Sequence, residues 1–471
     1  MLGSPTKTQA NTLNVFREHD HRTYYGKRSA KLTGDNWIMN FVLDFKYEVD
    51  GDDGEAGVVF DMRTNANPQR VHEVLILNVS WKNNASVRDG IHKGINIPAL
   101  AILPPNMVMN RYLDWKLTSR SDSQKQAVHR LPVKRLGIQD DKRTLILGPD
   151  AMFEIGREPS VILQPGEGIY AWTPHNTQPK DISVHKGEIY YNLLEILQRC
   201  LPPETFHTWI LMLGHTWMSM GYNLLADVLH GIPAICVVGD ANTWKSLSAA
   251  CCLDFFGQNM LDHCNLRSIT LPSLETRWVT KPLPLISHDF KNYKTAVMIL
   301  ECSYEQTIHV NCKTQEKRVK PATSILMTMN YDIFEDTVQA ATDRNRLMTR
   351  ICALEMNIEI ADLDDDDTQA LKKARNQASG NAEKLVALYA PELMQELVKE
   401  INSAKTKMLG ILAGFGVTTG VQRAARMWAT LLKAGEKVAA ALDFDVDKGA
   451  LLECVKKHAR FTSGYQQQVN M

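Results

Sequence analysis

The segment that most constrains the fold lies in the middle of the chain and reads IPAICVVGDANTWKSLSAACCLDFFG (residues 232–257). Its apolar run, Ala234 to Val238, is typical of a buried strand, and Gly239 then starts a turn. Lys245 and Ser246 follow at the start of a helix rich in small residues. Strand, turn and helix in this order form the context in which the pattern G-x-x-x-x-G-K-[ST] binds phosphate. The segment therefore predicts an α/β fold with a parallel sheet and crossover helices.

The chemistry of such a loop assigns roles to its residues. Backbone N–H groups point inward, and the helix N-terminus adds positive potential where a phosphate would sit. Lys245 would contact the β- and γ-phosphates of ATP, and the Ser246 hydroxyl would ligate Mg²⁺. The predicted nucleotide-binding residues are Gly239, Asp240, Ala241, Asn242, Thr243, Trp244, Lys245, Ser246 and Leu247.

One position departs from the pattern, because Trp244 stands where the second glycine belongs. Glycine suits that place since the backbone must approach the phosphates closely, in a torsion that other residues can resist. The indole either turns outward or weakens nucleotide binding, and relief of strain in Trp244→Gly would then tighten it. The alternative reading is a chance match within a buried strand, turn and helix.

Two later apolar runs end in polar residues that a nucleotide site could use. The run LPLIS is followed by His288 and Asp289, where a pair of acids would hold the metal and activate the attacking water. Only Asp289 is acidic, so we expect it to share Mg²⁺ with Ser246, while His288 is a base or a turn residue. The run SILMTM ends in Asn330, which could orient water near the γ-phosphate or simply cap a helix.

Three arginines precede the next apolar strand in DRNRLMTRICALEM, namely Arg344, Arg346 and Arg350. An arginine here could reach the γ-phosphate site of a neighbouring subunit and stabilise developing charge. A solvated basic face is the alternative.

The order of these motifs resembles that of the superfamily 3 and AAA+ helicase-type P-loop ATPases. The closest likeness is to the helicase-like ATPase domains of phages, plasmids and eukaryotic mobile elements, over roughly residues 36 to 360. The resemblance implies Walker A roles for Lys245 and Ser246, and a Walker B role for Asp289. It also implies that Asn330 is a sensor and that Arg350, with Arg346 next, acts in trans. Such ATPases form homo-oligomers, often hexamers, on single-stranded DNA or RNA.

Composition changes along the chain predict the domains. We expect a polar, loosely ordered segment (1–35), a β-rich N-terminal domain (36–168) and a P-loop ATPase domain (190–360). An acidic linker (361–368) and a helical C-terminal domain (369–466) follow. The run TAVMILEC (295–302) is one of the strands expected in the ATPase domain.

Composition bounds the partners and the compartment. Equal numbers of basic and acidic residues, 53 each, give no case for non-specific coating of nucleic acid, although a local basic groove stays possible. Nine scattered cysteines, all from Cys200 onward, favour a reduced intracellular protein, nuclear or cytoplasmic. The apolar stretch from Trp209 to Leu229 is interrupted by polar residues, so we expect a buried helix and no membrane partner.

One weaker pattern in the sequence concerns zinc, and other functions compete with the leading one. Cys302, His309 and Cys312, with His263 and Cys264 upstream, match no regular zinc spacing. The leading interpretation is a helicase-like ATPase that moves on or remodels nucleic acid. Its rivals are a non-hydrolysing scaffold or nucleic-acid-binding protein derived from such an ATPase, and a small-molecule kinase.

Overall fold

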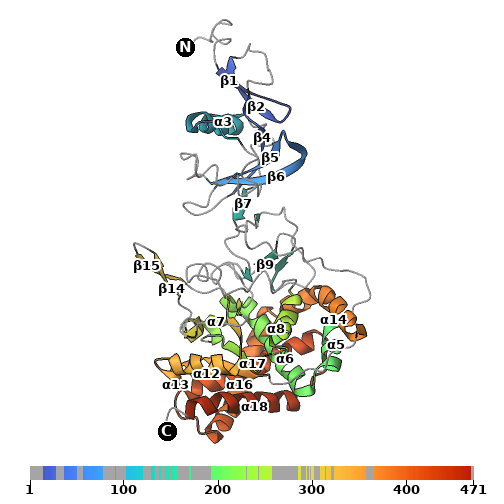
Figure 1. Ribbon diagram of the computed structural model, residues 1–471, viewed down its shortest axis with the longest axis vertical. Coiled ribbons are helices and arrows are strands. Elements are labelled where there is room, and N and C mark those ends of the chain that lie inside the picture. The colour runs from blue at the N-terminus through green and yellow to red at the C-terminus, as the bar shows by residue number, and fades with distance from the viewer. Residues whose placement is uncertain are drawn as a thin grey trace. The chain divides into compact units, whose positions relative to one another are not determined.

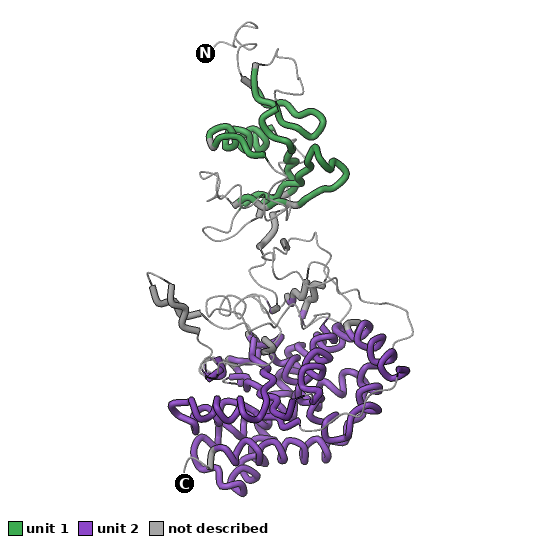
Figure 2. Tube along the Cα trace, viewed as in Figure 1, with its two compact units in different colours: residues 1–133, 165–175 green, residues 134–164, 176–471 purple. Residues whose placement is uncertain are grey.

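The computed structural model contains two compact units, Met1–Val133 with Pro165–His175, and Lys134–Gln164 with Asn176–Met471 (Figure 2). Residues 134–164, expected in the N-terminal domain, group with the second unit. The structure describes residues 14–27, 37–49, 57–77, 91, 102–119, 129–132, 137–138, 144–148, 151–155, 169–170, 192–229, 231–241, 243–256, 285–287, 293, 296–297, 299–301, 308–312, 315–319, 323–356 and 365–467.

The first unit contains two sheets and a helix, α3 (Asn106–Thr118) (Figure 1). The five-stranded sheet has the order β11-β7-β4-β5-β6, and the three-stranded sheet has the order β1-β2-β3. Their bounds are β1 (Asn14–His19), β2 (Arg22–Lys27), β3 (Trp37–Met39), β4 (Phe41–Val49), β5 (Gly57–Thr64), β6 (Asn67–Leu77), β7 (His129–Pro132) and β11 (Ile169–Tyr170).

The segment expected to be loosely ordered contains a β-hairpin, β1–β2. Its two turn residues, Asp20 and His21, both have positive φ, as a type I′ turn requires. Phe16 is buried, and the Thr23 hydroxyl donates to the carbonyl of Phe41 at 2.8 Å. The polar composition concealed this hairpin because few of its side chains are buried, namely Phe16, Thr23 and Tyr24 among those described.

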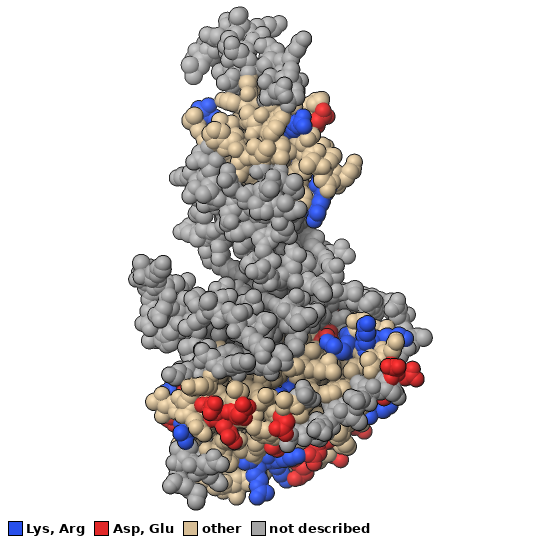
Figure 3. Space-filling view, viewed as in Figure 1, with Lys and Arg blue, Asp and Glu red and all other residues tan. Residues whose placement is uncertain are grey.

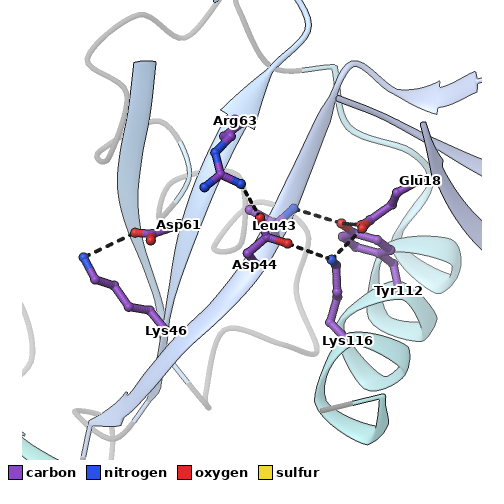
Figure 4. Close-up of polar contacts among 8 residues, drawn as sticks. All are labelled: Glu18, Leu43, Asp44, Lys46, Asp61, Arg63, Tyr112 and Lys116. Atoms are coloured by element: carbon purple, nitrogen blue, oxygen red, sulfur yellow. Dashed lines mark hydrogen bonds and ion pairs between the residues drawn. The ribbon is translucent and has the colours of Figure 1, made fainter. Parts of the chain in front are cut away.

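Helix α3 is an element that strand patterns in the sequence did not predict. It begins after Pro105 and buries Met109, Tyr112 and Leu113, the i, i+3, i+4 spacing of a helix face. A polar network fastens it to the sheets (Figure 4). The Tyr112 hydroxyl accepts from the Leu43 amide at 3.0 Å and donates to Glu18 at 2.6 Å, and Lys116 binds the same carboxylate at 2.7 Å.

A four-stranded parallel sheet lies at the centre of the second unit, in the order β13-β16-β12-β17. Its strands are β12 (Ala234–Val238), β13 (Leu285–Ser287), β16 (Ile325–Met329) and β17 (Ile351–Glu355). Every residue of β12 and β16 is buried, as expected for parallel strands covered on both faces. The chain runs from β12 out to β13, back to β16 and then across to β17. The order therefore reverses at β12, where α/β sheets bind ligands.

Helices cover both faces of this sheet. One face shares a core with α6 (Pro203–Met220), α8 (Lys245–Asp254) and α17 (Val421–Ala441). The other face packs against α12 (Tyr331–Ala340), α13 (Arg344–Met348) and α18 (Lys448–Gln467). The remaining elements are α5 (Leu193–Cys200), α7 (Tyr222–Leu229), α14 (Asp365–Gln377), η4 (Ala378–Asn381), α15 (Ala382–Ala387), α16 (Pro391–Gly414), β8 (Gly137–Ile138), β9 (Thr144–Gly148), β10 (Ala151–Glu154), β14 (Ile308–Cys312) and β15 (Gln315–Val319).

Helices α6 and α17 approach closely because glycines meet where they pack. A Cβ on Gly214 would lie 2.6 Å from the backbone nitrogen of Gly435. The side chains of Leu211 and Ile210 lie 3.4 and 3.5 Å from the position that a Cβ on Gly435 would take. No helix among the described residues is long and apolar enough to span a membrane.

Two expectations about local structure were wrong. The run 295–302, expected as a strand, is helical at the residues that the structure describes there, and Ala296, Val297, Ile299 and Leu300 are buried at helical spacing. Short apolar runs do not distinguish a buried strand from a buried helix. Asp365, Asp366 and Asp367, placed in the acidic linker, instead form the first turn of α14, where carboxylates favour a helix.

Candidate nucleotide-binding site

The carboxyl end of β12 leads directly into the predicted phosphate loop. The Met356 amide donates to Val238 at 2.7 Å, and the Gly239 amide donates to Met329 at 3.3 Å. A Cβ on Gly239 would lie 1.8 Å from the Met356 carbonyl oxygen. The glycine is therefore required because the chain leaving β17 passes against the backbone of the loop.

Lys245 begins α8, and its side chain turns back into the loop. The residue is only 5% exposed. Its ammonium donates to the Gly239 carbonyl at 2.9 Å, to the Asp240 carbonyl and to the Thr243 hydroxyl at 2.8 Å. The positive charge is thus held where the loop curves, close to the position that the phosphate-loop pattern assigns to the β- and γ-phosphates.

Thr243 closes the loop on itself. Its hydroxyl donates to the Asp240 carbonyl at 2.9 Å while it accepts from Lys245. Its carbonyl accepts from the Lys245 amide at 2.7 Å. A bound phosphate would compete with these acceptors for the ammonium, so the loop as it stands is in a closed state.

Trp244 adopts an ordinary backbone conformation, with φ −63° and ψ 17°. The strain that was expected at the missing second glycine is absent in this closed loop, because no positive φ is needed there. The half-buried indole packs against the core that covers the α8 face of the sheet. Trp244 therefore contributes to packing in this conformation.

The other predicted loop residues divide by exposure. Asp240 and Ala241 are exposed, Ser246 is partly exposed in the first turn of α8, and Leu247 packs against the core. Asn242 lies outside the described residues. Ser246 is thus placed where its hydroxyl can meet a ligand at the helix N-terminus.

The residues expected at the neighbouring strand ends are only partly described. Asn330 follows β16 directly and precedes α12, but its side chain makes no capping hydrogen bond to that helix. It therefore does not serve as the side-chain cap considered from the sequence. His288 and Asp289 lie outside the described residues. The strand that precedes them, β13, is an edge strand of the sheet and pairs with β16.

A carboxylate that no sequence pattern indicated lies at this edge. Glu355 ends β17, opposite Val238 in register, and accepts a hydrogen bond from the Tyr331 hydroxyl at 2.8 Å. Since Tyr331 follows β16 and Glu355 ends β17, the bond joins the two strands that flank β12. Burial, and next the Glu355 carboxylate, raise the pKa of the Tyr331 phenol, with a smaller contribution from Asp240 of the loop. The pairing of residues 24 positions apart has no local sequence signal.

Helix α18 holds the backbone of Glu355. His458 is buried, its Nδ1 accepts from the Glu355 amide at 3.1 Å, and its Nε2 lies 2.8 Å from the Thr208 hydroxyl. Because Thr208 donates to the Glu204 carbonyl, Nε2 carries the proton and the ring is neutral. Burial, and then the charge of Lys457, lower the pKa of His458 to about 3.

The predicted arginines lie at the opposite edge of the sheet. Arg350 directly precedes β17, whose first residue pairs with the first residue of β12, so six residues of extended chain, roughly 20 Å, separate its level in the sheet from Gly239. Arg350 is 6% exposed, whereas Arg346 on α13 is exposed and Arg344 is half-buried. None of them faces the loop of its own chain at this edge, and Arg346 is the more accessible to another subunit.

The far end of α8 is anchored to the helical part of the unit. Asp254 forms a bidentate ion pair with Arg375 of α14, at 2.5 and 3.4 Å. Burial raises the pKa of Asp254, and the guanidinium partly offsets this effect. The Trp209 indole on α6 donates to the Ser248 carbonyl at 3.0 Å. These contacts fix the helix whose N-terminus carries Lys245.

Metal ligands are sparse among the described residues, which contain no group of three His, Cys, Asp or Glu side chains that could hold a metal. His309 and Cys312 lie on β14, while Cys302, His263 and Cys264 are outside the described part of the chain. A Mg²⁺ bound with a nucleotide would use Ser246, phosphate oxygens and water, the usual kinds of ligand for that ion, together with Asp289, which the sequence predicts as a second protein ligand.

Comparison with known proteins supports the architecture. No family model matches the chain, and no curated protein sequence matches it. A solved structure described as "SCCmec type IV Cch - active helicase" superposes with a TM-score of 0.60 at 13% sequence identity, covering 96% of this chain and 78% of that one. At this identity the likeness concerns the fold. The chain therefore has a helicase-like fold, with a β-rich N-terminal region, a central parallel sheet and a helical C-terminal region.

Proposed function

We propose that this chain is a helicase-like ATPase that couples the binding and hydrolysis of ATP with Mg²⁺ to movement on, or remodelling of, single-stranded nucleic acid. The observation that carries the proposal is the placement of Lys245. Its buried ammonium lies in a glycine-started loop at the carboxyl end of the strand where the sheet order reverses. This is where such folds bind phosphate.

The bound nucleotide would supply the phosphoanhydride bond that is cleaved, and Mg²⁺ would neutralise charge on its phosphates. Lys245 and the N-terminus of α8 bind the phosphates, and Ser246 and Asp289 hold the metal. Asn330 and Asp289 are the proposed residues for orienting and activating water. Leu247 and Trp244 pack beneath the loop and keep its backbone in place.

A homo-oligomer is part of the proposal because no arginine of α13 or of the start of β17 can reach the loop of its own chain. An exposed Arg346 can instead face the loop of an adjacent subunit, where it would stabilise charge in the transition state. Arg350, which is buried, would then act by holding the start of β17. A ring of six subunits satisfies every such interface.

The experiment that tests the proposal compares Lys245→Ala with the wild type. ATP with Mg²⁺ should raise the melting temperature of the wild type and leave that of Lys245→Ala unchanged, because the variant lacks the charge that binds the phosphates. ATP hydrolysis stimulated by a single-stranded oligonucleotide should likewise be lost. Lys372→Ala, an exposed position on α14, is the matched control and should behave as the wild type. Equal shifts in wild type and Lys245→Ala would refute the phosphate-loop assignment.

A second candidate function is a non-hydrolysing scaffold that keeps the fold. Trp244 favours it, because the phosphate-loop pattern has a glycine at that position. A scaffold would show neither an ATP-dependent melting shift nor turnover, yet would still bind nucleic acid. The two functions are therefore separated by the wild-type measurements alone.

A further inference from the structure

The hairpin of helices α16 and α17 contains a long segment without acids. Residues 401–435 include Lys405, Lys407, Arg423, Arg426 and Lys433 but no Asp or Glu, so the segment carries a formal charge of +5. The rest of the unit mixes both signs, and on the face shown in Figure 3 basic and acidic side chains lie close to one another. This segment, which we call the basic tip, therefore differs from its surroundings.

Ion pairs separate the basic tip from the rest of the same two helices. Lys437 on α17 binds Glu400 at 2.9 Å and Glu396 at 3.4 Å, and Lys433 binds Glu436 at 2.6 Å. By contrast, Lys405, Lys407 and Arg426 form no ion pair with any described residue. Among the described residues, Lys433 at the edge of the tip is thus paired, whereas Lys405, Lys407 and Arg426 are not.

The exposed face of α16 near these charges carries only small or short polar residues besides the lysines. Asn402, Ser403, Thr406, Gly410 and Gly414 are exposed on it, within the part of α16 that the basic tip contains. A Cβ on Gly410 or Gly414 would meet no atom within 4 Å. Glycine destabilises a helix interior relative to alanine, and packing within the chain does not require it at Gly410, whereas Gly414 is the last residue of the helix. Gly410 is explained if an external molecule lies against the helix backbone.

We propose that the basic tip binds the sugar–phosphate backbone of single-stranded nucleic acid. Lys405, Lys407 and Arg426 contact phosphates, the hydroxyl and amide side chains donate hydrogen bonds, and the glycines let the strand approach the helix. The chemistry is that of sequence-independent binding, because no aromatic side chain is exposed within the described residues of the tip to stack on bases. The inference rests on the proposed function, since it names the surface that the nucleic acid of that function would use.

The test measures binding of a fluorescein-labelled 30-nucleotide poly(dT) by fluorescence anisotropy over a series of salt concentrations. The triple variant K405Q/K407Q/R426Q should bind about tenfold more weakly. The slope of log K against log salt should fall by about 2, because each phosphate that a cation neutralises on a single strand contributes about 0.7 to it. The matched control K399Q/K448Q removes exposed lysines outside the tip and should bind as the wild type.

A second variant separates shape from charge. G410Q/G414Q leaves the charge unchanged but fills the exposed face of α16, so it should weaken binding without changing the salt slope. All variants should keep the wild-type response to ATP, because none of these residues lies at the phosphate loop. The lysine and arginine variants should keep the wild-type melting temperature, and G410Q/G414Q should melt at or above it, because it replaces exposed helical glycines.

Each other outcome is decisive. Wild-type affinity and slope in the triple variant would overturn the proposal, as would equal losses in the control. Loss of oligomers in the triple variant by sedimentation would show that the tip is an interface between copies, which also overturns it. If the ATP response of the wild type fails while the tip variants lose poly(dT) binding, the surface stands and the ATPase function falls.

Discussion

At the scale of single residues, the backbone conformation of Trp244 changes the interpretation of the missing glycine in the phosphate loop. The missing glycine suggested strain, yet the residue has φ −63° and its indole packs on the core. Trp244→Gly should therefore lower the free energy of unfolding by about 1–2 kcal/mol, part of the 3–5 kcal/mol typical of a fully buried Trp reduced to Ala. Urea unfolding measures this. Trp244→Phe is the control and should lose less, whereas a more stable Trp244→Gly would mean that the loop is strained after all.

The same scale shows what the sequence could predict about the site. The strand and the helix on either side of the loop from Gly239 to Ser246 were predictable, because strand, loop and helix follow one another locally along the chain. Glu355 and Tyr331 were not, because their hydrogen bond depends on which strands flank β12, and strand order is a property of the whole sheet. The neutral state of His458 likewise follows from burial among residues far away in sequence.

At the scale of elements, the contact between α6 and α17 gives a prediction about packing. Gly214→Ala should lower the free energy of unfolding by about 1–3 kcal/mol, because its Cβ would overlap the backbone at Gly435. Gly410→Ala is the matched control: it is also a helical glycine but has open space around it, so it should raise stability by about 0.5–1 kcal/mol. Equal effects of the two substitutions would contradict the close approach of the helices.

Helix α18 gives a prediction about pH. The pKa of His458 is lowered to about 3 in the folded chain, against about 6.5 when unfolded. Between these values the unfolded chain binds one more proton, so the stability that this histidine contributes is complete above pH 6.5 and is lost as the pH falls towards 3. His458→Gln should reduce the slope of unfolding free energy against pH by about 1.4 kcal/mol per pH unit in that window. Unfolding followed at several pH values gives the slope, and an unchanged slope would mean that His458 titrates normally.

Element prediction succeeded or failed for a physical reason in each case. The strands β12, β16 and β17 are short apolar runs bounded by glycine or polar residues, and they were predicted. The run 295–302 is also short and apolar but is helical where the structure describes it, because a run of this length cannot distinguish a buried strand from a buried helix by its periodicity. Helix α3 was missed among strands, although its buried positions have helical spacing.

At the scale of the whole molecule, the proposed oligomer can be tested by mixing subunits. Arg346→Ala and Lys245→Ala should each abolish ATP hydrolysis alone. Together they should recover part of it, because some interfaces pair an intact loop with an intact arginine. The measurement is steady-state ATPase activity across mixing ratios, with Arg344→Ala as the control at a neighbouring arginine. Activity of the wild type as a strict monomer would exclude a trans-acting Arg346.

The hydrogen bond between His458 of α18 and the Glu355 amide also has a consequence for folding during synthesis. The phosphate loop is synthesised long before His458, yet the strand that closes against Gly239 is fixed in part by that histidine. A nascent chain that has already emerged through β17 therefore still lacks one support of its nucleotide site. A chain released before α18 is synthesised would therefore hold its phosphate loop less firmly, because it lacks this hydrogen bond to the strand beside the loop.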